Sequence, residues 1–228
     1  MQKENKILVW DLPVRLFHWL LVGAIVAQWV TAELLDDAMD WHFYIGYFTL
    51  GLILFRLIWG FVGPRYSRFS QFLVSPKAYW QYLKSLRNPQ KHHYVGHNPL
   101  GGLLVPLVII VIGIQTVSGL FATDDVLHSG PYISMVSAEV QALLNEIHHT
   151  TFDIITVIIV VHLVAILWHK FIAKHHIIKA MFTGKKQGEY NSGISSSNVL
   201  LAVLIAACIG AAIYALIALA PVPEAFYF

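Results

Sequence analysis

The chain has 228 residues, of which 57% are hydrophobic and only 12% charged, and its mean hydropathy is +0.63. These values lie outside the usual range of soluble domains and exclude an ordinary soluble globular protein. The formal net charge is +2. The single cysteine, Cys208, excludes intrachain disulfides and cysteine-ligated clusters, so any bound metal must depend on histidine.

Five apolar stretches approach the roughly 20 residues needed to cross the hydrocarbon core of a bilayer. They cover about 14–34, 43–63, 100–121, 148–172 and 198–220. The segment before the first stretch carries charges and a proline and has no small-residue cleavage site, so we expect no removable signal peptide. The sequence therefore predicts an all-α membrane protein with five spans.

The connections carry further signals. A short amphipathic helix, KAYWQYLKSL, is expected after Pro76, lying in the membrane interface. Pro99 suits the first turn of the third span. A short outer helix is expected around Val136–Leu144, and the Gly and Ser clusters of 184–197 predict a flexible linker. The fifth stretch has neither histidine nor charge, which favours packing or assembly. We therefore divide the chain into a transmembrane domain, 1–186, and a linker with an additional helix, 187–228.

Basic residues segregate to alternate connections. All 15 Lys and Arg lie before the first span, at the end of the second span and the loop after it, or after the fourth span. The first-to-second and third-to-fourth connections contain acidic residues and neither Lys nor Arg. The positive-inside rule places the N-terminus in the cytoplasm and the C-terminus outside. The basic loops are expected to meet anionic lipid or a cytoplasmic partner, not nucleic acid.

Two of the 12 histidines, both in the fourth span, are the first candidates for a functional site. His162 lies within TVIIVVHLVAILW, where a polar ring is costly unless it has a partner, so it indicates a functional site. His148 precedes it by 14 residues, nearly four helical turns, so both project from nearly one face about 21 Å apart. His149 is the competing choice, rotated by about 100° towards another face.

If His148 and His162 each bind one metal group, the opposite ligands must come from other spans and lie at the same depths in the membrane. His18 lies near the cytoplasmic end of the first span and His42 at the outer entry to the second. The predicted topology therefore pairs His18 with His162 and His42 with His148. Two imidazoles on facing helices suit a six-coordinate haem iron with no open position for oxygen. This pattern predicts two b-type haems and electron transfer.

Other residues are candidates for supporting roles. Arg15 and Arg56 lie near the cytoplasmic ends of the first two spans, where pairing with haem propionates and snorkelling to lipid phosphate are equal alternatives. Gly46, Gly51 and Gly113 would either admit a porphyrin or serve helix packing. Of the remaining histidines, the best candidates for a proton or quinone role are His97 and His169.

Several motifs occur together in chain order: VWDLPVRLFHW (9–19), HFYIGYFTLGLILFR (42–56), FVGPRYSRF (61–69) and GHNPLGG (96–102), followed by His148 and His162. Over about 9–186 the chain resembles bacterial cytochrome b561 proteins and the b-type subunit of nickel-iron hydrogenases. The resemblance implies a four-helix bundle with two haems b, electron exchange with membrane quinone, and ligands at His18, His42, His148 and His162. The fifth span lies beyond this core. The resemblance leaves the partner open between a hydrogenase, a c-type cytochrome and other redox proteins.

Three functions compete. The first is a membrane electron-transfer subunit between the quinone pool and a redox partner. The second, implied by the resemblance, is a self-sufficient oxidoreductase that oxidises superoxide and reduces quinone, although the acidic outer loops would repel that anion. The third is a histidine-lined metal-ion transporter, for which Asp153 is the available mid-membrane carboxylate.

Overall fold

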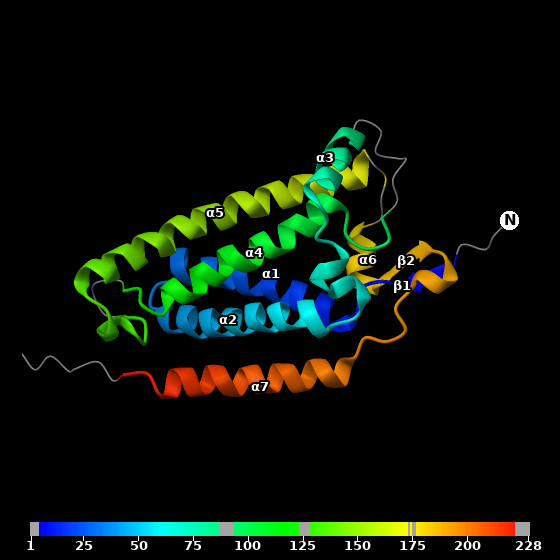
Figure 1. The fold of residues 1–228 in the computed structure, drawn as a ribbon. Coiled ribbons are helices and arrows are strands. Elements are labelled where there is room, and N and C mark those ends of the chain that lie inside the picture. The colour runs from blue at the N-terminus through cyan, green and yellow to red at the C-terminus, as the bar shows by residue number, and fades with distance from the viewer. Residues whose placement is uncertain (1–4, 87–93, 124–127, 173, 175–176, 222–228) are drawn as a thin grey trace, which may run out of the picture. The chain divides into compact units, whose positions relative to one another are not determined.

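The computed structural model describes residues 5–86, 94–123, 128–172, 174 and 177–221. Five helices are long and apolar enough to cross a membrane (Figure 1). They are α1 (Leu12–Glu33), α2 (Met39–Val62), α4 (Pro99–Gly119), α5 (Ala138–Phe171) and α7 (Val199–Ala218). The smaller elements are α3 (Pro76–Ser85), α6 (Ile177–Thr183), and the strands β1 (Asn5–Leu8) and β2 (Lys185–Gly188). The prediction of an all-α membrane protein with five spans is confirmed.

The predicted starts of two helices are confirmed, since α3 begins at Pro76 and α4 at Pro99. Ser75 caps α3 by accepting a hydrogen bond from the backbone N–H of Ala78, and Pro76 occupies the first turn. Asn98 accepts a hydrogen bond from Gly101 N at 2.7 Å, directly before α4 begins at Pro99.

The fourth spanning helix is longer than the sequence predicted. The short outer helix expected around Val136–Leu144 is the first part of α5, which begins at Ala138 and runs for 34 residues without a break. Its opening, AEVQALLNEI, contains no Gly or Pro and many good helix formers, so nothing ends the helix before the apolar stretch. At about 1.5 Å per residue, α5 is about 51 Å long, well beyond the hydrocarbon core.

The expected flexible linker at 184–197 is also corrected. Its first residues form β2, which pairs antiparallel with β1 in the register Asn5↔Gly188 to Leu8↔Lys185. Gly184 makes the preceding turn at φ +75°, and its carbonyl accepts hydrogen bonds from Val9 N and Trp10 N. A Cβ added at Gly184 would stand 2.6 Å from Trp10 O, so both the positive φ and the close approach require glycine.

The chain divides into two compact units. Unit 1 comprises 1–18, 56–108 and 157–203, and unit 2 comprises 19–55, 109–156 and 204–228. Each spanning helix contributes one part to each unit, so each unit contains its own set of helix segments.

A buried aspartate organises unit 1. Asp11 is fully buried and accepts hydrogen bonds from Val14 N at 2.9 Å and from Trp59 Nε1 at 3.1 Å. Its second carboxylate oxygen accepts from Ser67 Oγ. Asp11 thereby caps the start of α1 and joins it to the end of α2 and the turn beyond.

Small residues and hydrogen bonds connect the helices of unit 2. Gly51 lies against Ile209 of α7, and Gly113 lies against Ile53 of α2, in ordinary van der Waals contact for an added Cβ. Tyr132 donates its hydroxyl hydrogen to the backbone carbonyl of Leu216 on α7 at 2.6 Å. These two glycines therefore serve helix packing, one of the two roles considered for them.

Candidate functional site

Unit 1 brings together His18 of α1 and His162 of α5. Their ring centroids are 6.5 Å apart and the ring planes are inclined by 57°. Both side chains are half-buried. This is one of the two pairs that matching depths predicted.

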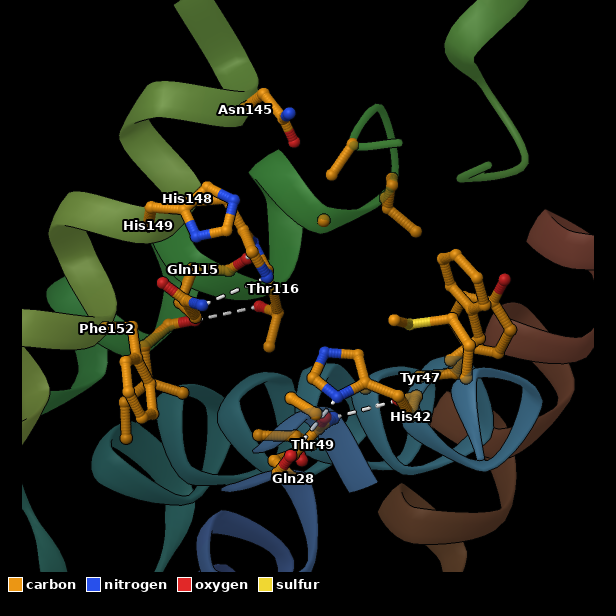
Figure 2. Close-up of a pocket in the computed structure, with 18 of the residues that line it drawn as sticks. Gln28, His42, Tyr47, Thr49, Gln115, Thr116, Asn145, His148, His149 and Phe152 are labelled. Carbon is orange, nitrogen blue, oxygen red and sulfur yellow. Dashed lines mark hydrogen bonds between the residues drawn. The ribbon is translucent and has the colours of Figure 1, made fainter. Parts of the chain in front are cut away.

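Unit 2 brings together the other predicted pair. His42 of α2 and His148 of α5 have ring centroids 6.4 Å apart and planes inclined by 70°. Figure 2 shows the two imidazoles projecting from different helices towards one cavity. His149 also lines this cavity, although its predicted direction was towards another face.

The spacing within each pair suits two imidazoles that face one metal ion. A metal–imidazole bond is about 2 Å long, so rings on opposite sides of one ion have centroids roughly 6 Å apart. The centroid separations of 6.5 and 6.4 Å agree with this distance. Among the described residues there is no group of three or more His, Cys, Asp or Glu side chains that would hold a metal ion by themselves. The donor sets therefore fit haem iron, for which the porphyrin supplies the other ligands.

Hydrogen bonds orient both imidazoles of unit 2. His148 Nδ1 lies 2.9 Å from the backbone carbonyl of Gln115, and His42 Nδ1 lies 3.2 Å from that of Gln28. A carbonyl only accepts, so both neutral rings are assigned a proton on Nδ1 and a lone pair on Nε2. The side-chain amide nitrogen of Gln115 lies 3.1 Å from His148 Nε2, as expected for an acceptor at that atom. Nε2 is thus the nitrogen of each ring that carries the lone pair a metal would use.

A cavity of about 280 Å³ lies between these residues in unit 2. Its lining is mostly apolar, with polar side chains from α1, α2, α4 and α5 (Figure 2). Gly46 borders it beside Gln28, whose Nε2 would be 3.3 Å from an added Cβ. Gly119 borders it beside His148, whose Cε1 would be 2.9 Å from an added Cβ. Two of its walls therefore depend on the absence of a side chain.

Two arginines of unit 1 have buried donor atoms. Arg56 is only 3% exposed, and its guanidinium lies over the Phe69 ring at 5.2 Å. Arg15 donates from Nη1 to the Phe182 carbonyl at 2.5 Å. Arg56 Nη1 and Arg15 Nε are buried and have no hydrogen-bond partner among the described residues. Buried guanidinium donors of this kind suit a carboxylate such as a haem propionate.

His97 belongs to the segment before α4, and Lys186 of β2 contacts this segment. The His97 ring lies between Trp10 and Phe72, each at a centroid distance of 4.6 Å. Burial, helped by the charges of Arg56 and Lys186, lowers the His97 pKa to about 3. Burial also lowers the Lys186 pKa to about 8. Lys186 Nζ donates to the carbonyls of Val95 and Gly96 at 2.9 and 3.2 Å. Lys186 thus ties β2 to this segment.

The other candidate for a proton or quinone role lies at the end of α5. His169 Nε2 is 3.4 Å from the side-chain amide nitrogen of Asn98, the residue that caps α4. The His169 ring also contacts Trp168, at 5.0 Å between ring centroids. Both histidines singled out for this role therefore have aromatic neighbours, and His169 has an amide beside it as well.

Sequence reasoning missed several residues that shape the site. Gln115 contacts His148 through both its backbone and its side chain, and Gly119 makes room for the same ring. Their spacing of four residues on α4 places them on one helix face, but no such signal distinguishes them from other residues of an apolar span. Asp11 was noted only within a motif, and nothing in its local sequence indicates burial.

The chain matches a family model described as prokaryotic cytochrome b561 over residues 9–184. Similar curated proteins are named as probable nickel-iron hydrogenase b-type cytochrome subunits. The one from Azotobacter chroococcum mcd 1 is 27% identical over 219 residues, covering 81% of this chain and 90% of the relative. One from Escherichia coli (strain K12) is 29% identical over 149 residues, covering 49% and 62%. One from Rhodobacter capsulatus is 22% identical over 225 residues, covering 82% and 83%. No solved structure matches the chain significantly.

The family match covers most of the chain, and its residues include both histidine pairs and both buried arginines. The five apolar helices agree with a multi-pass membrane cytochrome. The family implies haem b as cofactor and electron transfer as activity. The chain belongs to the prokaryotic cytochrome b561 family.

Proposed function

We propose that this protein is a dihaem b-type cytochrome that transfers electrons between the membrane quinone pool and a redox partner protein. His18 and His162 hold one haem, and His42 and His148 hold the other. The observation that carries the proposal is the near-identical separation of the two pairs, 6.5 and 6.4 Å between ring centroids. Each pair joins histidines from two different helices, at the spacing expected for two ligands on one iron.

The chain's own residues fix what the haems do. Each histidine pair would hold a haem iron between two imidazoles, a ligand set that would leave no position for oxygen and would supply one-electron exchange. The carbonyls of Gln28 and Gln115 hold His42 and His148 in the tautomer that presents Nε2. Arg15 and Arg56 supply buried donors for the propionates of the haem in unit 1.

The proposed partner is a nickel-iron hydrogenase, because the similar curated proteins carry the name of its b-type cytochrome subunit. A c-type cytochrome is the other partner class that the sequence left open. Asp36 and Asp37 in the connection before α2 suit a basic docking surface. Asp124 and Asp125, in the connection before α5, lie outside the described residues. Raised salt should then slow electron exchange with the partner, whereas an exchange rate that does not respond to salt would exclude charge-driven docking.

The proposed orientation has the N-terminus in the cytoplasm and the C-terminus outside, in a bacterial inner membrane. Single cysteines placed at Ser75 and Ser137 in a Cys208→Ser background test it. An impermeant thiol reagent added to intact spheroplasts should label Ser137→Cys and leave Ser75→Cys unlabelled until the membrane is broken. The opposite labelling would reverse the topology.

Quinone reduction is tested with the purified protein in liposomes. Reduced protein is mixed with a short-chain quinone, and the loss of the ferrous absorption band is followed by stopped flow. Rapid reoxidation by quinone supports the proposed role. A protein that binds two haems but does not react with quinone would contradict the quinone-linked function while leaving the haem assignment intact.

A further inference from the structure

The two units carry opposite charge. Unit 1 contains all 15 Lys and Arg residues and 3 of the 13 acidic residues, a formal charge of +12. Unit 2 contains the other 10 acidic residues and neither Lys nor Arg, a formal charge of −10. The two histidine pairs therefore lie in electrostatically different surroundings, which the net charge of +2 conceals.

The charge difference between the units also holds close to the two histidine pairs. Arg15 lies one helical turn before His18 on α1, and the buried guanidinium of Arg56 belongs to the same unit. The carboxylate of Asp11 already accepts hydrogen bonds from Val14, Trp59 and Ser67. Arg56 also interacts electrostatically with Asp11. Its Nη1 and the Nε of Arg15 still have no hydrogen-bond partner among the described residues and can donate to another acceptor.

The cavity at His42 and His148 has no such cation. Among the described residues that line it, Glu33 is the only one with a formal charge at neutral pH. The carboxylate of Glu33 would lower the midpoint potential of a haem at this cavity. The carbonyl oxygens that accept hydrogen bonds from His42 and His148 would lower it too, because they make the imidazoles stronger electron donors to a metal. Both features favour ferric over ferrous iron.

We propose that the haem held by His18 and His162 has the higher midpoint potential and the haem held by His42 and His148 the lower. This inference rests on the proposed function. Reduction adds one negative charge to a haem site, which nearby guanidinium groups stabilise and a nearby carboxylate destabilises. Both haems have two histidine ligands, so ligand identity does not offset the difference. One electron passing from ferrous iron in unit 2 to ferric iron in unit 1 then moves downhill, and no proton or bond changes.

A spectroelectrochemical titration of the purified full-length protein tests this order. We expect two components of equal amplitude. His42→Ala should retain only the component of higher potential, and His162→Ala only the lower. Equal potentials, or the reverse assignment, would overturn the inference.

Two variants that remove a charge, and leave all four histidines in place, test whether charge sets the order of the potentials. Arg56→Gln should lower the potential of the higher component alone, and Glu33→Gln should raise that of the lower component alone. Exposed Arg65 and Glu139 provide matched controls, since Arg65→Gln and Glu139→Gln should shift neither component. If Arg56→Gln and Glu33→Gln also shift neither, the electrostatic account fails while the dihaem assignment stands. A wild-type protein with fewer than two haems would instead refute the proposed function.

Discussion

Gly119 of α4 lies directly against the imidazole of His148, so that a Cβ added at this glycine would stand 2.9 Å from Cε1 of the ring and 3.3 Å from Nδ1. Real Cβ contacts do not reach the shorter distance. The ring cannot retreat without losing the hydrogen bond between Nδ1 and the Gln115 carbonyl. The His148 ring can therefore occupy its position only because residue 119 has no side chain.

Gly119→Ala should consequently disturb only one haem. We expect the purified variant to contain less haem at the His42–His148 pair, by up to one haem per chain, with the other redox component unchanged. Haem content and the redox spectrum measure both effects. Gly23→Ala is the control, because nothing lies within 4 Å of a Cβ at that position of α1. A Gly119→Ala protein with two unperturbed haems would show that His148 does not need this space.

Asp11→Ala should destabilise unit 1. The change leaves the Trp59 indole N–H and the Ser67 hydroxyl without their acceptor, each at a cost of about 1–3 kcal/mol. It also removes the cap on Val14 N, worth about 1 kcal/mol. The midpoint of thermal unfolding in detergent should fall by at least ~5 °C.

Ser67→Ala provides the graded comparison for Asp11. It removes one of the three hydrogen bonds and leaves the carboxylate with the other two, so its midpoint should fall by less than that of Asp11→Ala. Equal midpoints for wild type and Asp11→Ala would mean that the carboxylate does not organise this unit.

His97 should make stability depend on pH. Its folded-state pKa is lowered from 6.5 to about 3, first by burial and then by Arg56 and Lys186. Between pH 6.5 and 3, His97 binds a proton in the unfolded chain but not in the folded protein. The free energy of unfolding therefore decreases as the pH falls from 6.5 towards 3. The loss from this group is up to about 1.4 kcal/mol per pH unit.

The variant His97→Phe isolates that contribution, because phenylalanine retains ring contacts with Trp10 and Phe72 but cannot bind a proton. Unfolding midpoints of the two proteins should be compared at several pH values. The wild-type midpoint should fall more steeply below pH 6.5. Parallel curves would show that His97 gains a proton in the folded protein as readily as in the unfolded chain.

Much of the histidine arrangement could be predicted from sequence. The 14-residue spacing of His148 and His162 depends only on helix geometry, and the alternation of basic and acidic connections supplies the depths of His18 and His42. Local patterns therefore sufficed to choose partners, and the structure brings the same partners together. Their role as haem ligands stays a prediction, as does the domain boundary at 186/187.

Other features depend on contacts between distant segments. The strands β1 and β2 are four residues each and nearly 180 residues apart, and KKQG has no alternation of apolar and polar residues. The hydrogen bonds from Val9 and Trp10 to Gly184 position these strands. Whether Gly46 faces a cavity or Gly51 faces another helix depends likewise on neighbouring helices, so sequence left both roles open.

The central claim is that each histidine pair holds one haem b. Pyridine haemochrome quantification and redox difference spectra of the purified wild type, His162→Ala and His42→Ala test it most directly. The account predicts two haems b per wild-type chain and one in each variant, with a different spectral component lost in each. A wild type without haem, or a variant that keeps both haems, would contradict it.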